Sequence, residues 1–211
     1  MKLISEYGFR ELIGHFFKMN FPKGKNFIDR NCEDFLVYVY IDPETGINLE
    51  IIGEFIDGKA ELFRIISHKL RYSDDFMLEA YGNTDNETLE QGKTIEKQYT
   101  PDWIVPVREN TLYDPYRDKI FPDDMLLMIA TIYEGKLEFE SLWVRPVMVS
   151  DDNVFCETIE NGKILPKGTQ AAVMSNAVLG GRAFYDLPDI IAIDPLVADF
   201  VVKWFQEHGN R

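Results

Sequence analysis

The chain has 211 residues, of which 45% are hydrophobic and 27% charged, and its formal net charge is −14. This length suffices for a hydrophobic core that needs no metal or disulfide, and the composition excludes wholesale disorder. So large a negative charge repels nucleic-acid phosphates and disfavours direct binding of DNA or RNA.

The first predicted element is an amphipathic helix from Ser5 toward Asn20. Ser5 is a suitable N-cap, and Leu12, Ile13 and Phe16 begin an apolar stripe at helical spacing. A Pro-Gly segment at 21–25 ends it.

Residues 35–81 have the pattern of an antiparallel meander. Strands are predicted at 35–41, 47–56, 60–66 and 76–81, because these stretches are rich in aromatic and β-branched residues. Asp57-Gly58 suits the two positive φ angles of a type I′ hairpin.

Residues 83–122 form a polar stretch punctuated by prolines. Thr84 and Glu87 have the spacing of a capping box for a short helix. Aromatic rings among charges on such a segment are typical of a recognition surface, although rings that fold back over the sheet give the same pattern. The candidate partner-binding residues are Asp102, Trp103, Tyr113, Asp114, Tyr116 and Asp118.

Residues 125–165 are predicted to form hairpins. A strand at 125–133 is favoured over a helix, because Glu134-Gly135 and the alternating residues after it indicate a turn and a second strand to 149. Pro146 is best tolerated at an edge or a bulge of that strand. Asn161-Gly162 predicts a further hairpin between 154–159 and 163–165.

Two helices are predicted near the C-terminus. Residues 169–179 are small and apolar, and this composition predicts a buried helix. For residues 195–208, Asp194 is the cap, Pro195 the first helical residue and Gly209 the stop. The apolar face of this second helix is expected to pack on the sheet.

The predicted fold is therefore α+β, an antiparallel meander of hairpins packed by an N-terminal and a C-terminal amphipathic helix. We expect one domain over residues 1–211, with a candidate subdivision near 83–122. Glu6 and Glu11 interrupt any apolar leader, and the apolar run at 125–132 is too short to span a bilayer. Cys32 and Cys156 form no CxxC pair, which favours two free thiols in a reducing compartment. We therefore expect a cytoplasmic protein that does not associate with a membrane.

No motif indicates a cofactor or a metal site. His15, His68 and His208 have no ligand spacing, and neither a GxSxG sequence nor a phosphate-binding glycine loop is present. We therefore expect neither metal nor cofactor.

An enzymatic alternative rests on five residues, three of which, in Pro122-Asp123 and Glu134-Gly135-Lys136, superficially resemble the PD…ExK pattern of metal-dependent nucleases. Two acidic residues would hold a divalent ion and a lysine would orient water, while two further glutamates share one face of a strand. Against this, the ExK residues fall in a predicted turn, and basic surroundings for DNA are absent. The residues are Asp123, Glu134, Lys136, Glu138 and Glu140.

The charge distribution favours a different function. Residues 73–160 carry 20 acidic and 7 basic residues, whereas the flanking parts are close to neutral. A concentrated negative field attracts a basic protein. The leading hypothesis is a non-enzymatic, inhibitory binding protein with an acidic surface, a profile similar to that of immunity proteins and phage-encoded inhibitors of host defence. A metal-dependent hydrolase and a structural or scaffold subunit are the alternatives, and the carboxylates could simply keep the protein soluble.

Overall fold

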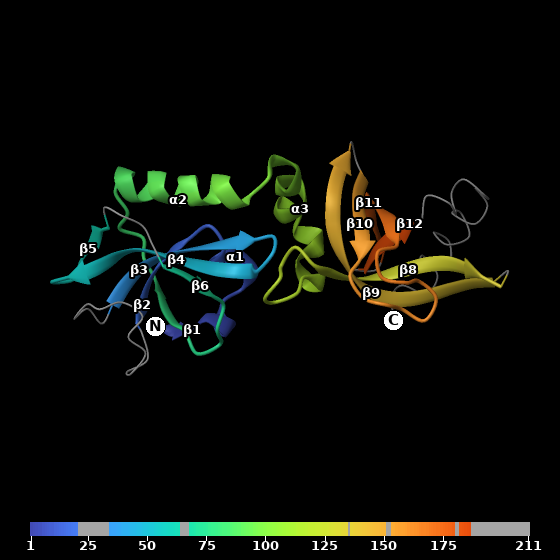
Figure 1. Cartoon of the computed structure of the whole chain (residues 1–211), viewed down its shortest axis with the longest axis horizontal. Coiled ribbons are helices and arrows are strands. Elements are labelled where there is room, and N and C mark those ends of the chain that lie inside the picture. The colour runs from blue at the N-terminus through green and yellow to red at the C-terminus, as the bar shows by residue number, and fades with distance from the viewer. Residues whose placement is uncertain (21–33, 64–67, 135, 151–152, 180–181, 187–211) are drawn as a thin grey trace. The chain divides into compact units, whose positions relative to one another are not determined.

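The computed structural model describes residues 1–20, 34–63, 68–134, 136–150, 153–179 and 182–186 (Figure 1). The chain divides into two compact units: unit 1 comprises residues 1–101 and 119–122, and unit 2 comprises 102–118 and 123–211. Each unit is mostly antiparallel sheet with short helices. The division falls inside the 83–122 segment that the sequence marked as a candidate subdivision.

Unit 1 contains one seven-stranded sheet in the order β1-β7-β2-β3-β4-β5, with β6 also paired to β4. All its pairs are antiparallel. Its elements are β1 (Lys2–Leu3), η1 (Ile4–Glu6), α1 (Phe9–Leu12), β2 (Phe16–Asn20), β3 (Asp34–Asp42), β4 (Gly46–Ile56), β5 (Lys59–Leu62), β6 (His68–Arg71), β7 (Met77–Ala80) and α2 (Asn86–Tyr99).

Both faces of the unit 1 sheet are covered. Alternate residues of β3 point to opposite faces, so Val37 and Val39 pack in one core cluster while Leu36 and Tyr38 pack in another. The N-terminal segment covers the first face, and α2 lies across the second through Ile95 (Figure 1). A sheet buried on both sides explains why β3 is apolar almost throughout.

The helix α2 confirms the prediction of a helix after residue 84, but its cap is different. The Asp85 side chain accepts a hydrogen bond from the Thr88 N–H at 2.8 Å, so Asp85 and not Thr84 is the N-cap. Gly92 faces the sheet, where an added Cβ would lie 2.6 Å from Cζ of Phe16. The glycine therefore allows the helix to approach the sheet closely.

The predicted N-terminal amphipathic helix at 5–20 is wrong. Only Phe9–Leu12 is α-helical, and Phe16–Asn20 is the strand β2. Gly14 adopts φ +80° at the break. The apolar residues that suggested one helical stripe come instead from a short helix and from a strand with both faces buried.

The predicted hairpins of unit 1 are confirmed at β3 and β4. Asp57 and Gly58 have φ values of 48° and 78°, as a type I′ turn requires. The strand after this turn is β5, Lys59–Leu62, and residues 64–67 of the predicted 60–66 strand lie outside the described residues. The predicted strand at 76–81 corresponds to β7.

Unit 2 is a closed five-stranded barrel in the order β10-β11-β12-β8-β9. Successive strands pair antiparallel, and because the number of strands is odd, β12 and β8 run in the same direction and close the barrel as a parallel pair. Its elements are η2 (Asp102–Ile104), α3 (Val105–Glu109), η3 (Thr111–Tyr116), β8 (Met125–Tyr133), β9 (Lys136–Ser150), β10 (Asn153–Thr158), β11 (Gln170–Leu179) and β12 (Arg182–Asp186).

The strand predictions for 125–149 are confirmed. The register between β9 and β10 shifts so that Phe155 faces Met148 and Cys156 faces Pro146, which leaves Val147 as the extra residue of a bulge. Pro146 therefore lies next to a bulge, where a missing N–H donor is tolerated.

Two predictions for the C-terminal half are wrong. Residues 170–179 form the strand β11 and not a buried helix, because small apolar residues suit the wall of a narrow barrel as well as a helix interior. Residues 163–165 form bends and not the second strand of a hairpin. The predicted helix at 195–208 lies outside the described residues.

Candidate functional site

The predicted partner-binding residues of the 102–118 segment have different environments. Asp102 and Trp103 are exposed, and 39% of Trp103 is accessible to solvent. Tyr113 is only 1% exposed and belongs to the core of unit 2, and Tyr116 packs against that core. Within the described residues, Trp103 is therefore the aromatic side chain of this set that a partner can reach most easily.

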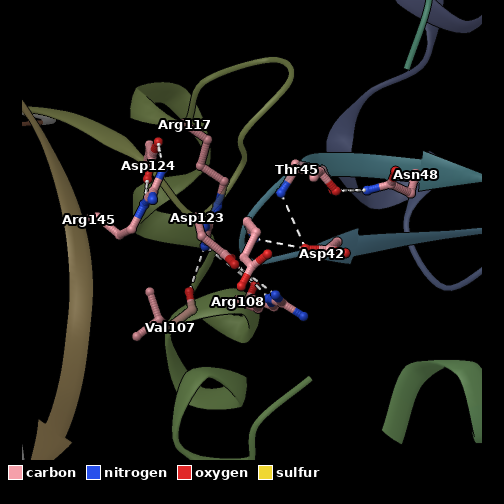
Figure 2. Close-up of polar contacts among 11 residues, drawn as sticks. Asp42, Thr45, Asn48, Val107, Arg108, Arg117, Asp123, Asp124 and Arg145 are labelled. Atoms are coloured by element: carbon pink, nitrogen blue, oxygen red, sulfur yellow. Dashed lines mark hydrogen bonds and ion pairs between the residues drawn. The ribbon is translucent and has the colours of Figure 1, made fainter. Parts of the chain in front are cut away.

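Two aspartates that precede β8 bind arginines in bidentate pairs (Figure 2). Asp123 accepts from Nε and Nη2 of Arg108 at 2.9 and 2.7 Å, and Asp124 accepts from Nε and Nη2 of Arg145 at 2.7 and 2.8 Å. Arg108 belongs to α3 and Arg145 to β9, so the two pairs tie the helical segment and a barrel strand to the same short stretch. Planar forks of this kind fix geometry better than a lysine does.

Arg117 is the most buried of these arginines, with 2% of its side chain exposed. It pairs with Asp114 at 3.2 Å and donates to the Val107 carbonyl at 2.5 Å (Figure 2). The candidate partner-binding residue Asp114 is thus engaged within unit 2. The backbone N–H of Asp118 donates to the Asp124 carbonyl at 2.9 Å, and this places the end of the segment beside the start of β8.

Among the five residues of the enzymatic alternative, those whose side chains the structure describes have different contacts. Asp123 is paired with Arg108, and Glu134, at φ 50°, occupies the turn between β8 and β9. Glu138 is exposed on β9, and the side chain of Lys136 lies outside the described residues. Within the described residues, no group of three or more His, Cys, Asp or Glu side chains is arranged to hold a metal ion.

Glu140 has a clear structural role that the sequence did not indicate. Its carboxylate accepts hydrogen bonds from the backbone N–H groups of Lys163 and Leu165, each at 2.8 Å. A Cβ at Gly162 would lie 2.4 Å from this carboxylate, so the glycine leaves the space that the carboxylate occupies. Glu140 therefore anchors the loop that follows β10 to the strand β9.

Unit 1 contains a buried polar cluster on the sheet face that α2 covers. The Asp42 carboxylate binds the Lys69 ammonium group, which also lies 4.9 Å from the ring centroid of Tyr99 and 5.9 Å from that of Tyr40. The two rings are 4.6 Å apart, and the Tyr40 hydroxyl donates to Glu50 at 3.0 Å. One carboxylate and two tyrosine rings thus contact the ammonium group, and a second carboxylate, Glu50, binds one of these rings. We call Tyr40, Asp42, Glu50 and Tyr99 the ammonium cage.

Burial and charge shift the pKa values of the ammonium cage. Burial, together with the negative charge of Glu50, raises the pKa of Tyr40. Burial alone would raise the pKa of Asp42, but hydrogen bonds from Lys69 and from the N–H groups of Glu44 and Thr45 lower it overall. Asp42 is therefore ionised and Tyr40 is a neutral hydrogen-bond donor at neutral pH.

Asn48 lies beside the ammonium cage with an incomplete set of hydrogen bonds. It pairs across the sheet with Tyr40 and is fully buried. Its amide nitrogen donates to the Thr45 hydroxyl and the Gly46 carbonyl, each at 2.8 Å, and Figure 2 shows it beside Thr45. Its Oδ1 has no hydrogen-bond partner among the described residues. A buried acceptor left in this way favours a donor from outside the described residues, such as a bound molecule.

Sequence reasoning missed this cluster, although a signal was present. Tyr40 and Asp42, like Asn48 and Glu50, are spaced two apart in strands that are otherwise apolar. Polar residues at period two within a buried strand indicate a polar site on one face.

Comparison of this chain with family models, curated proteins and solved structures gives no match. Among the described residues, no helix has the length and apolar character that crossing a membrane requires.

Proposed function

We propose that the protein is a non-enzymatic binding protein of the cytoplasm, and that an acidic surface of unit 2 binds a basic protein partner. The observation that carries this proposal is the use of arginine in unit 2. The three arginines between residues 102 and 160 each pair with an aspartate of the same unit. Among the described residues, these arginines therefore do not neutralise the exposed carboxylates Asp102, Glu134, Glu138 and Glu160.

These exposed carboxylates are the elements of the proposed surface. Unit 2 carries 18 acidic and 9 basic residues over its whole length. Among the described residues, no ion pair involves Asp102, Glu134, Glu138 or Glu160, all of which are exposed. Such a field repels nucleic acid and accelerates association with a basic protein, which then blocks that protein's own site.

Trp103 gives the proposed surface an apolar anchor. Aromatic side chains contribute strongly to protein–protein interfaces when they enter a pocket of the partner. Trp103 follows the exposed Asp102, while Ile104 next to it is buried in the core of unit 2. The tryptophan is therefore held on a fixed element and not on a long flexible loop.

The predicted C-terminal amphipathic helix is also part of the proposal. We infer that its apolar face, which includes Phe200, Val201 and Trp204, packs on a sheet of the protein and does not bind the partner.

The contacts of Asp123 and Glu140 favour this function over the hydrolase alternative. Both carboxylates are used to hold segments of unit 2 together, one by an arginine and one by backbone N–H groups. A carboxylate fixed in this way is not available to bind a metal ion or activate water without loss of those contacts.

The proposal is tested by affinity capture from a lysate of the source cell, at low and at high salt, with the partner identified by mass spectrometry. The wild-type chain should retain a basic protein at low salt and release it at high salt. A variant with Asp102→Asn, Glu134→Gln and Glu138→Gln should retain much less. The matched control carries Glu61→Gln, Glu79→Gln and Glu87→Gln, three exposed carboxylates of unit 1, and should behave like wild type. Equal retention by all three proteins would contradict the proposal.

A further inference from the structure

The ammonium cage of unit 1 has the chemistry of a site for an alkylammonium group. Ammonium ions bind favourably over the faces of tyrosine rings, and carboxylates beside the rings add charge attraction. In the free protein the bound cation is the chain's own Lys69, whose ammonium group contacts Asp42 and lies over Tyr99 at 4.9 Å. Lys69 therefore occupies the position that the ammonium group of an external ligand would take.

The charges of the cage are not balanced by this lysine. Asp42 is 7% exposed and Glu50 is 8% exposed, and the Lys69 ammonium group pairs with Asp42. Lys69 lies directly across from Glu50 in the sheet, yet its ammonium group contacts Asp42. Among the described residues, the hydrogen bond that Glu50 accepts is that of the neutral Tyr40 hydroxyl. A buried carboxylate with this environment keeps the cage favourable for a cation, whether that cation is Lys69 or an external ammonium group.

Asn48 is an independent observation that points to a ligand at the same place. It lies between the cage residues on the sheet, across from Tyr40 and two residues before Glu50 on the same face. It is fully buried, and its Oδ1 has no partner among the described residues. An ammonium group has three N–H donors and no acceptor, which suits a site that offers only acceptors.

The lysine that fills the cage is able to leave it. One third of the Lys69 side chain is exposed, compared with 10% of the Asp42 side chain. Because a lysine stem is flexible, the ammonium group can move into solvent while the strand β6 stays paired with β4. Exchange of one ammonium group for another leaves the charge of the site unchanged.

We propose that the ammonium cage is a lysine-recognition site, which Lys69 fills in the free protein and a lysine side chain of the basic partner fills in the complex. This inference rests on the proposed function, because it gives the partner a second contact and identifies its chemistry. The match is to lysine, since the group that the cage already holds is the compact ammonium group of a lysine.

The test uses N-acetyl-lysine amide as the probe and the full-length chain with Lys69→Met, which keeps the stem and removes the internal ammonium group. Titration calorimetry should show about tenfold tighter binding of the probe to the variant than to wild type, because the internal competitor no longer reduces the open fraction of the site. N-acetyl-norleucine amide, which has an apolar side chain in place of the lysine, should not bind. Adding Tyr99→Ala to the variant should abolish binding of the lysine probe.

Control variants make the result specific to the cage. Lys93→Met removes an exposed lysine that pairs with Glu90 and should leave the affinity of the probe at the wild-type value. Lys69→Gln serves as the second opened variant, and far-UV circular dichroism verifies that both opened variants are folded. Equal affinity of folded Lys69→Met and wild type for the probe overturns the inference, as does equal binding of the norleucine probe. This experiment contains no partner protein, so its failure is distinct from failure of the lysate capture.

Discussion

Residues 102–122 are divided between the two units, and each unit holds its part of this stretch by different contacts. Unit 1 holds residues 119–122 through the backbone: the Ile47 N–H donates to the Ile120 carbonyl at 2.7 Å, and Gly46 leaves room for it. Unit 2 uses charged side chains: Arg108 pairs with Asp123 just outside the segment, and Arg117 braces the 102–118 segment internally through Asp114 and the Val107 carbonyl. Backbone contact depends on shape, whereas bidentate ion pairs depend on charge as well as shape. The comparison shows that three arginines of unit 2 are engaged in contacts within that unit.

The largest expected effect tests the backbone attachment of unit 1. Gly46 has φ +77°, and an added Cβ would lie 2.3 Å from the Ile120 carbonyl oxygen. Gly46→Ala should therefore cost about 4 kcal/mol, of which ~1 comes from the left-handed backbone and ~3 from the clash. Urea unfolding followed by circular dichroism measures this loss.

Gly58 provides the matched control for Gly46. It has a similar φ of +78°, but an added Cβ meets nothing within 4 Å. Gly58→Ala should therefore cost only about 1 kcal/mol. Equal losses at both glycines would mean that the Ile120 contact adds no constraint to unit 1.

The next effect tests the charged attachment of unit 2. Arg117→Met should destabilise unit 2 by about 3 kcal/mol, because it removes a buried cation and leaves the Val107 carbonyl without its donor. Trp103, Trp143 and Trp204 all belong to unit 2, so tryptophan fluorescence during urea unfolding reports on this unit.

A surface lysine is the control for Arg117. Lys93 pairs with Glu90, and both side chains are 70% exposed. Lys93→Met should change stability by less than about 0.5 kcal/mol. If Arg117→Met changes the fluorescence transition as little as Lys93→Met does, the ion pairs do not hold the 102–118 segment.

A smaller effect is expected where α2 meets the sheet of unit 1. Gly92→Ala gains about 1 kcal/mol of helix propensity but loses about 2 from contact with Phe16 and Tyr38, for a net cost of about 1 kcal/mol. Gly82→Ala meets nothing within 4 Å and should be neutral or slightly stabilising. A stabilising Gly92→Ala in thermal unfolding would show that the helix–sheet spacing is not tight.

The smallest effect is the pH dependence that Asp42 gives to unit 1. Its pKa in the folded protein is lowered, so its contribution to stability is fully present above the unfolded value of about 3.9 and is lost as the pH falls through the folded value. Asp42→Asn should therefore flatten the decline of stability on the acid side of pH 4. Urea midpoints measured from pH 7 down to pH 3 test this, and an unchanged slope would argue against the Asp42–Lys69 pair.

The sequence predicted those parts of the fold whose signals are local. Strands such as β3 and β8 carry dense β-forming residues, and Asp57-Gly58 encodes its own turn. The prediction from sequence failed at Phe16 and Phe17, because a strand that is buried on both faces has a pattern similar to the apolar stripe of a helix. It also failed at 170–179, because small residues suit either a strand or a helix. Closure of the barrel by the β12–β8 pair joins residues more than fifty apart, and no local pattern encodes such a contact.

The candidate sites were predicted less completely, for a related reason. The spacing of aromatic and acidic residues marked the 102–118 segment as a candidate recognition surface. It did not indicate that Tyr113 is buried or that Asp114 binds Arg117. The ammonium cage requires Lys69 to reach past its direct neighbour Glu50 to Asp42, and this depends on the packing of Tyr99 from α2. Side-chain direction of this kind follows from tertiary packing.

The most direct test of the acidic surface measures how the affinity for the captured basic partner depends on ionic strength. For wild type, the dissociation constant should rise steeply with salt, and most of the change should lie in the association rate. The unit 2 variant with Asp102→Asn, Glu134→Gln and Glu138→Gln should lose much of this dependence, whereas the unit 1 variant with Glu61→Gln, Glu79→Gln and Glu87→Gln, of equal net charge, should keep it. Identical salt dependence for the two variants would contradict a binding surface on unit 2.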